Sequence, residues 1–345
     1  MSARRTMWLL FVAAAAARGA EPFTLVLLPD TQNYTMQTTN RLRYFSAQTA
    51  WITNRCNAEN IRLVLHEGDI TQYTYGYRGT NRLEWERASN CLAALDGWVP
   101  YLACYGNHDF YWNAGSFTRN TAEFNRYFSL GRFQGALTIA GSYPAGQSDN
   151  VGATFTAGGV DWLVLSLEWA PSDATLAWAD QLLDEYPRHR VMVLTHCHLY
   201  LDGLWHGRKA SHYSDPHGAP GPVNNGLELW DKFIRKHSRI AFVFNGHAAT
   251  GPDETGARRA DEGDYGNTVF QLMANYQMLL EPDGTYGGGG YLRVLRFDPT
   301  NATLSVHTYS PYLDRFMTDS NNQFVITNLL VFDTSAPTAP SGLRA

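Results

Sequence analysis

Residues 99–109, Val-Pro-Tyr-Leu-Ala-Cys-Tyr-Gly-Asn-His-Asp, are the stretch around which the fold is organised. The apolar part, Val99–Tyr105, predicts a buried strand, and Gly106 lets the backbone turn sharply at its carboxyl end. Three polar side chains follow the turn: Asn107, His108 and Asp109. In α/β sheets the carboxyl ends of strands are where ligands bind. Because so short a stretch also occurs by chance, other parts of the chain have to support this interpretation.

Two earlier stretches repeat the arrangement. Apolar runs predict strands over Phe23–Pro29 and Ile61–His66, which lead into Asp30-Thr31-Gln32 and Glu67-Gly68-Asp69. Helices are predicted between the strands, over 42–56 and 84–95. The resulting β-α-β-α-β order implies parallel strands with right-handed crossovers. It places three side chains at one edge of a sheet: Asp30, Asp69 and Asn107.

Later strands end in histidines. Strands are predicted over 160–167, 190–194 and 240–244, and helices near 174–185 and 227–236. The second and third of these strands lead into His196 and into Gly246-His247. Residues 110–150 predict an excursion over the site with a short helix near 121–128, and strands predominate after residue 269. The long loop 202–222 carries three histidines that we expect to be solvated: His206, His212 and His217.

Composition and charge limit the class of protein. The chain has 345 residues, of which 44% are hydrophobic and 17% charged, so it can bury a full core. Its net charge is −5 and its Lys and Arg residues form no run. We therefore predict no nucleic-acid partner. The sequence does not indicate an oligomeric state.

The ends of the chain differ from its middle. Residues 1–20 have a basic start, a short apolar stretch and small residues, which predicts a signal peptide cleaved after Ala17 or Ala20. We expect an exported protein, periplasmic or extracellular, with no stable membrane insertion. Residues 21–333 form the predicted catalytic domain. Residues 334–345 predict a linker that resembles the opening of a fibronectin type III module.

Export permits disulfides, and the chain has four cysteines. Cys56 and Cys91 lie on apolar faces of the two predicted helices 42–56 and 84–95. They could form a disulfide or remain two buried thiols. Cys104 and Cys197 are expected to serve as packing groups near the site.

The polar residues at the strand ends suit a metal centre. They mix oxygen and imidazole donors, which favours Zn, Mn or Fe over Ca or Mg. One carboxylate can bridge two ions, and two ions can activate a hydroxide for attack on phosphorus. His108 is placed to protonate a leaving oxygen. The candidate ligands are Asp30, Gln32, Asp69, Asn107, His196 and His247.

The order of these blocks resembles the calcineurin-like metallophosphoesterase superfamily, whose motifs run D-x-H, G-D, G-N-H-D/E, H and G-H-x-H. The resemblance covers about residues 23–310. It implies an α/β fold of two mixed β-sheets packed face to face with flanking helices, an α/β/β/α sandwich. It also implies that Asp69 bridges two ions and that Asn107, His196 and His247 complete a second metal site. His108 would be the catalytic acid, supported by Asp109.

Two positions depart from the motifs. Gln32 stands where the family has a histidine, and Ala249 replaces the last histidine of G-H-x-H. Both family histidines belong to the first metal site. Gln32 would either bind the ion or hydrogen-bond to a ligand. We therefore expect one firm site and a first site that is weak or empty and favours a harder ion. Loop residues Asp253 or Glu254 could fill the gap.

The resulting prediction is an exported metal-dependent phosphoesterase that acts on a phosphate mono- or diester through a metal-bound hydroxide, with His108 as general acid. The alternative is a catalytically degenerate module that contains metal and binds a phosphorylated or glycan ligand. The changes at Gln32 and Ala249 motivate the alternative. The retained Asp69, Asn107 and His108 argue against it.

Overall fold

The computed structural model describes residues 20–36, 40–72, 82–110, 112–113, 116–133, 137–212, 215–218, 221–281 and 283–332. Apart from Ala20, the predicted signal peptide lies outside these residues, as does the predicted linker 334–345. None of the helices in the described ranges is both long enough and apolar enough to cross a bilayer.

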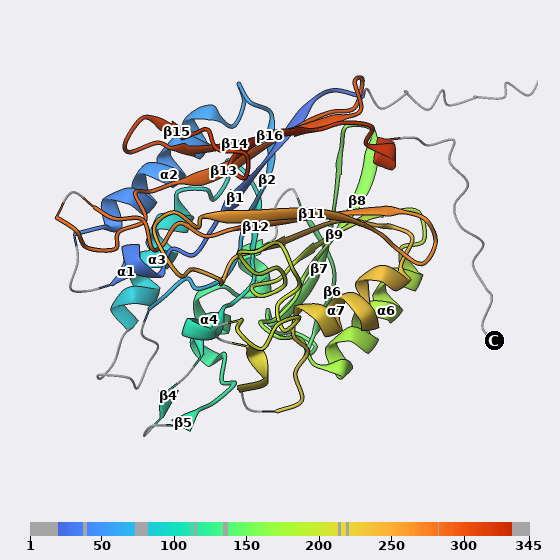
Figure 1. The fold of residues 1–345 in the computed structure, drawn as a ribbon, viewed down its shortest axis with the longest axis horizontal. Helices are drawn as coiled ribbons and strands as arrows, with labels where there is room; N and C mark the ends of the chain where they lie inside the picture. The colour runs from blue at the N-terminus through green and yellow to red at the C-terminus, as the bar shows by residue number, and fades with distance from the viewer. Residues whose placement is uncertain are drawn as a thin grey trace, which may run out of the picture.

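Two mixed β-sheets pack face to face in the described part of the chain, with helices on their outer faces (Figure 1). The predicted α/β/β/α sandwich is therefore confirmed. The first sheet has the order β15 (Arg315–Met317), β14 (Thr303–Ser310), β13 (Leu292–Asp298), β1 (Phe23–Leu28), β2 (Ile61–His66) and β3 (Tyr101–Ala103), with β16 (Gln323–Ile326) also paired to β14. The second has the order β11 (Gly256–Glu262), β12 (Thr268–Ala274), β10 (Ile240–Asn245), β9 (Arg190–Leu194), β8 (Val160–Ser166), β7 (Asn150–Ala157) and β6 (Thr138–Tyr143).

Short elements connect and cover the sheets. The helices are α1 (Gln32–Thr35), α2 (Leu42–Arg55), α3 (Arg82–Ala93), α4 (Ala122–Tyr127), α5 (Leu130–Phe133), α6 (Asp173–Glu185) and α7 (Gly226–Lys232). Single 3₁₀ turns are η1 (Asn107–Asp109), η2 (Pro216–Gly218), η3 (Ile234–Lys236) and η4 (Leu330–Phe332). A separate two-stranded pair consists of β4 (Trp112–Asn113) and β5 (Ser116–Phe117).

Strand direction positions the site. Strands β1, β2 and β3 are parallel, as the sequence predicted, and β8, β9, β10 and β12 are parallel in the other sheet. The remaining pairings in both sheets are antiparallel. The carboxyl ends of parallel strands share one edge of a sheet, so the turns after them are neighbours.

Aromatic side chains fill the space between the sheets. Trp162 of β8 is fully buried, and its ring centroid lies 6.3 Å from those of Phe23, Phe242 and Phe297. The next residue, Leu163, faces the opposite way and belongs to the apolar cluster beneath α6 and α7. This two-residue alternation explains why the middle of β8, residues 162–165, is apolar at every position, since both of its faces are buried there.

The second sheet has two strands that the sequence did not indicate: β6 lies within the predicted excursion 110–150, and β7 begins at its last residue and runs beyond it. Strands β6 and β7 extend the second sheet by an antiparallel hairpin on β8. Both strands contain glycine, which weakens a strand prediction, and these glycines make room for α6. A Cβ at Gly152 would lie 2.2 Å from a methyl group of Leu182, and one at Gly141 would lie 3.2 Å from the other.

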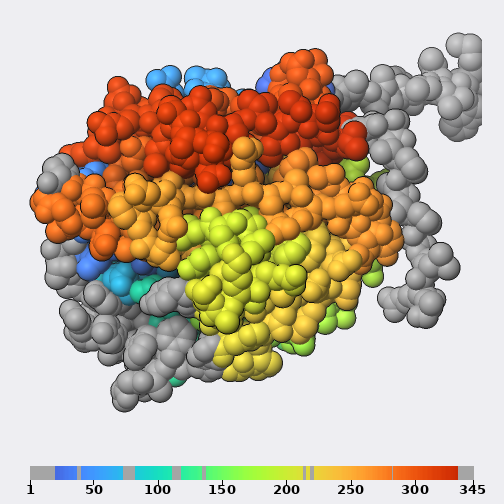
Figure 2. Space-filling model, viewed as in Figure 1, coloured from blue at the N-terminus to red at the C-terminus, as the bar shows by residue number. Residues whose placement is uncertain are grey.

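The loop that follows β9 packs against the second sheet. It is yellow-green in Figure 2 and lies beside the orange strands β11 and β12. Trp205 of this loop donates its indole N–H to Gln271 of β12 at 2.8 Å. His206 and His212 are buried, so the expectation that they are solvated is wrong, whereas His217 is exposed as expected. The polar residues of this loop suggested a solvent-exposed segment, but the loop folds back onto the second sheet.

All four cysteines are free and buried in the structure. The thiol of Cys91 lies 3.6 Å from the Ser46 hydroxyl on the facing helix α2. The Cys56–Cys91 disulfide hypothesis is therefore wrong for this structure, which has the two buried thiols of the alternative.

Candidate metal centre

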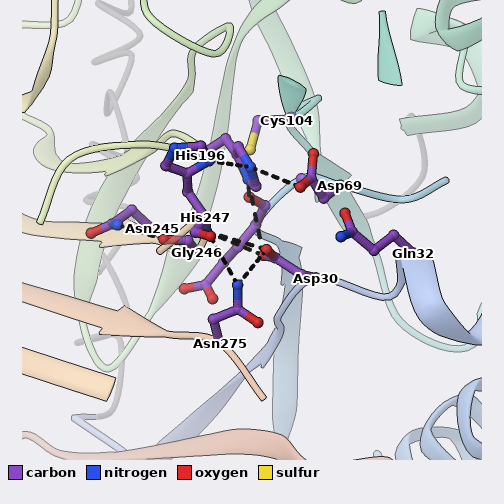
Figure 3. A network of polar contacts seen from close by, with 12 residues as sticks. Asp30, Gln32, Asp69, Cys104, His196, Asn245, Gly246, His247 and Asn275 are labelled. Atoms are coloured by element: carbon purple, nitrogen blue, oxygen red, sulfur yellow. Dashed lines mark hydrogen bonds and ion pairs between the residues drawn. The ribbon is translucent and has the colours of Figure 1, made fainter. Parts of the chain in front are cut away.

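The predicted ligands meet at the rim formed by the carboxyl ends of the parallel strands of both sheets. Figure 3 shows Asp30, Asp69, His196 and His247 gathered around one point, with the Gln32 amide directed toward the two carboxylates. Asp30 follows β1, Asp69 follows β2, Asn107 begins η1 after β3, His196 follows β9 and His247 follows β10. The structure thus brings together residues that are more than 200 positions apart in the chain, from Asp30 to His247.

Three polar atoms converge on Nε2 of His196. This nitrogen lies 3.2 Å from Asn107 Oδ1, 3.3 Å from Asp69 Oδ2 and 3.2 Å from His247 Nδ1. Donor atoms placed about 2.1 Å from one cation lie roughly 3.0 to 3.4 Å from each other at octahedral or tetrahedral angles. The three distances from His196 Nε2 are therefore those expected between donor atoms that share one cation.

The hydrogen bonding of His196 calls for a positive charge at Nε2, supplied either by a proton or by a bound cation. Its Nδ1 lies 2.7 Å from the carbonyl oxygen of Glu67, which can only accept, so Nδ1 carries a proton and donates it. In the neutral ring Nε2 then presents a lone pair to the oxygen lone pairs of Asn107 and Asp69. Facing lone pairs repel unless a positive charge lies between them.

The pKa values of His196 and Asp69 also indicate that a positive charge is stable at this position. Burial lowers the pKa of His196, but the Asp69 and Asp30 carboxylates outweigh burial and raise this pKa to about 10. Burial by itself would raise the pKa of Asp69, yet the adjacent His196 and His108 lower it below its usual range. Without a cation, a proton on His196 is the charge that balances the site.

A further group of donors adjoins this one, and most of its donor atoms are oxygens. Donor atoms of Asp30, Asp69 and His196 all lie within 4.8 Å of one another. Asp30 Oδ2 accepts a 2.6 Å hydrogen bond from Asn275 Nδ2, and burial raises the pKa of Asp30 to about 8. Gln32 is buried, and within the described ranges its Oε1 has no hydrogen-bond partner. A buried oxygen without a partner beside two carboxylates suits a cation.

Glycines allow the ligand turns to approach each other. A Cβ at Gly106 would lie 2.0 Å from Asp69 Oδ1, and a Cβ at Gly246 would lie 2.1 Å from Asp30 Oδ1. The ligand backbones are also strained, because φ is 46° at Asp69 and 73° at His247. The chain holds these ligands in conformations that only a well-packed surrounding can maintain. Taken with the donor set, the residues present fit a pair of divalent cations.

His108 and Asp109 make different hydrogen bonds near the ligands. His108 donates its backbone N–H to Asp69 Oδ1 at 2.9 Å, and its Nδ1 lies 3.1 Å from the carbonyl oxygen of Gln72. The Asp109 carboxylate accepts from the backbone N–H groups of Ile70, Thr71 and Gly106 and from the Thr71 hydroxyl, at 2.9 to 3.1 Å. The support expected from Asp109 is therefore given to the two ligand turns rather than to the His108 ring.

His66 is a second residue that organises the ligand turns, a role that its position at a strand end did not predict. Its Nδ1 accepts from the Gly68 backbone N–H at 3.2 Å, and its Nε2 lies 2.9 Å from the Thr31 hydroxyl. Burial lowers the pKa of His66 to about 3, which keeps the ring neutral. His66 therefore joins the turn that carries Asp69 to the turn that carries Asp30.

Sequence reasoning missed other residues near the ligands. Asp253 and Glu254, expected to fill the gap left by Ala249, are exposed. Asn275 and Gln277, from the loop after β12, contact Asp30 and Gln32 instead. A further group of donors within 4.8 Å consists of Cys197, His206 and His247. Only the shared position at a strand's carboxyl end could have pointed to Asn275.

Comparisons with known proteins found a matching family model and a relative of similar sequence. A family model described as calcineurin-like phosphoesterase matches residues 24–251. The chain is 28% identical over 295 residues to an uncharacterized protein, YvnB, of Bacillus subtilis (strain 168), a match that covers 84% of this chain and 20% of that protein. The chain thus spans about a fifth of the length of this curated relative.

Similar solved structures include a dimetal phosphatase from Danio rerio, with a TM-score of 0.49 and 14% identity, covering 88% of this chain and 98% of that one. They also include GAP50 of Plasmodium, an anchor in the inner membrane complex, with a TM-score of 0.45 and 9% identity, covering 93% of this chain and 95% of that one.

Proposed function

Because the chain belongs to the calcineurin-like phosphoesterase family, we propose that it is a metal-dependent hydrolase of phosphate mono- or diesters. The observation that carries the proposal is the convergence of Asn107, Asp69 and His247 on the Nε2 atom of His196, each within 3.3 Å. This donor set includes two imidazoles, a carboxylate and an amide oxygen, which suits Zn, Mn or Fe. We propose that a more weakly held cation occupies the first metal site, beside Asp30 and Gln32.

Divalent cations held there would neutralise charge on the phosphoryl group and activate water for attack on phosphorus. The chain itself supplies the proton for the leaving group. The Gln72 carbonyl oxygen accepts a hydrogen bond from His108 Nδ1–H, so Nε2 is the ring nitrogen left to face a leaving oxygen. Nε2 protonates that oxygen from the imidazolium form, in which both ring nitrogens carry a proton. The bond from the His108 backbone to Asp69 keeps this ring next to the ligand group.

The test is turnover of aryl phosphate mono- and diesters with added Mn²⁺, alongside elemental analysis. We expect His108→Ala to reduce kcat by about 10²- to 10⁴-fold with unchanged metal content. Asp69→Ala should lose both turnover and metal. His237→Ala, whose Nε2 bonds to Asp180 away from the ligands, serves as the control and should retain activity. Full activity in Asp69→Ala would contradict the mechanism.

The same assay separates the enzyme from the alternative, a module that contains metal and binds a phosphorylated or glycan ligand. A binding module would hold its cations yet turn over none of the esters. The fixed orientation of the His108 ring favours the enzyme, because a binding site has no need of an imidazole held by Nδ1 with Nε2 left for proton transfer.

We also propose that the protein is exported. The basic, apolar and small-residue segments of residues 1–20 support this proposal. Amino-terminal sequencing of the protein recovered outside the cytoplasm tests it. Recovery with Met1 intact inside the cell would contradict it.

A further inference from the structure

The amide group of Gln32 is held in one orientation by a residue far away in the sequence. Gln32 Nε2 donates to Gln277 Oε1, across 245 positions of the chain. Gln32 is only 4% exposed, and its other polar atom, Oε1, is without a hydrogen-bond partner among the described residues. Figure 3 shows this amide directed toward Asp30 and Asp69.

Gln277 is itself fixed by neighbours that contact the ligands. Its backbone N–H donates to Asn275 Oδ1 at 2.9 Å, and its carbonyl oxygen accepts from Asn33 Nδ2 at 2.9 Å. Asn275 in turn donates to the Asp30 carboxylate at 2.6 Å and to the His247 carbonyl oxygen at 3.2 Å. The loop after β12 is therefore tied to both ligand turns that lack the family's histidines.

An amide has two chemically opposite ends, so its orientation decides what the site can bind. With Nε2 given to Gln277, Gln32 offers an oxygen acceptor to the space beside two carboxylates. In the reversed orientation Gln32 would offer N–H donors to those carboxylates, and hydrogen bonds would replace a cation. An imidazole ligand differs, because either nitrogen can present a lone pair.

We infer that Gln277 is a positioning residue that keeps Gln32 Oε1 toward the first metal site and so makes that site an oxygen-donor site for a hard divalent cation, such as Mn²⁺ or Mg²⁺. Oxygen donors from Asp30, Asp69 and Gln32 suit such ions, whereas the imidazole-containing second site suits Zn²⁺. The protein then holds two chemically different cations. This inference rests on the metal centre of the proposed function and adds which ion each site takes.

The experiment measures cation binding to the full-length, metal-free protein. One equivalent of Zn²⁺ fills the second site, and Mn²⁺ is then titrated and followed by the electron paramagnetic resonance signal of free Mn²⁺. We expect one Mn²⁺ to bind per chain. Gln277→Leu should weaken Mn²⁺ binding about tenfold, in the range found for residues that orient a metal ligand, with Zn²⁺ content unchanged.

A double-variant cycle separates positioning from direct binding of the cation by Gln277. Gln32→Leu should also weaken Mn²⁺ binding, and Gln32→Leu/Gln277→Leu should bind no more weakly than Gln32→Leu alone. Gln48→Leu is the matched control. Gln48 is a buried amide that donates to the Tyr291 carbonyl oxygen at 2.7 Å and also leaves its oxygen without a partner among the described residues, but away from the ligands. It should leave Mn²⁺ binding unchanged.

Three results would overturn the inference: wild-type protein that takes up no Mn²⁺ beyond its Zn²⁺, wild-type affinity in Gln277→Leu, or additive losses in the double variant. Failure of the proposed function is a different observation, namely absence of phosphoester turnover while both cations are bound. The binding data therefore decide the role of Gln277 whether or not the protein hydrolyses the esters tested.

Discussion

The close approach of Gly246 to Asp30 predicts a large effect from adding one methyl group. In Gly246→Ala the new Cβ would lie 2.1 Å from Asp30 Oδ1, whereas real Cβ contacts essentially never fall below 3.0 Å. The carboxylate oxygen would have to move by about 0.9 Å. Asp30 cannot turn away freely, because Asn275 Nδ2 holds its other oxygen at 2.6 Å.

The consequence should appear in catalysis more than in folding. Gly246 does not have a left-handed φ, so alanine meets no backbone penalty there and the contact alone acts. A displacement on the order of 1 Å at a reacting centre can cost about 100-fold in rate. We therefore expect kcat/KM for an aryl phosphate ester to fall by about 100-fold and Mn²⁺ binding to weaken.

The assay compares turnover, Mn²⁺ binding and thermal unfolding for Gly246→Ala and for Gly251→Ala. Gly251 also lacks a left-handed φ, and a Cβ there meets nothing within 4 Å, so it is a matched control that should behave as the wild type. Wild-type turnover and Mn²⁺ affinity in Gly246→Ala would refute the argument that this contact sets the position of Asp30.

Three further outcomes follow from the structure. Asp109→Ala removes the acceptor of four hydrogen bonds in the two ligand turns, so the free energy of unfolding measured in urea should fall by about 3 kcal/mol or more, and an unchanged value would contradict this role. Cations bind the deprotonated ligands, and in the cation-free protein the pKa values of His196 and Asp30 are raised to about 10 and about 8. Mn²⁺ affinity measured by calorimetry should therefore increase as the pH rises from 6 to 8, and a pH-independent affinity would count against these ligands. Trp162→Ala should lower the free energy of unfolding by about 3 to 5 kcal/mol, because Trp162 is fully buried between the sheets. The control Trp98→Ala should cost little, because the side chain of Trp98 is 63% exposed. Equal losses in the two variants would contradict the position of the core.

The rim of the site could be predicted because each part of it is local in sequence. Asp30, Asp69 and Asn107 each follow an apolar strand directly, and parallel pairing of those strands is implied by the helices between them. These side chains therefore lie at one edge of the sheet, independently of how the rest of the chain folds. The sequence also indicated the sandwich, although only through resemblance to a family, since the pairing of β1 with β13 is not encoded locally.

The parts that could not be predicted depend on distant contacts. The glycines of β6 and β7 weaken the strand pattern, and only the approach of Leu182 explains them. The burial of His206 and His212 depends on the fold of a long loop against the second sheet. Likewise Asn275 reaches Asp30 across 245 positions, which no periodicity within the chain can indicate.

The ligands share one arrangement that explains why glutamine at position 32 needs a partner. His196 gives Nδ1 to a backbone carbonyl oxygen and turns Nε2 to the cation group, and Asp69 accepts a backbone N–H on Oδ1 while Oδ2 faces His196. Gln32 gives Nε2 to Gln277 and keeps Oε1 toward the carboxylates. Each of these three side chains is thus anchored by one atom and leaves the other free to face a cation. An unanchored amide could present N–H groups instead, so a glutamine can serve at this position only together with an acceptor such as Gln277.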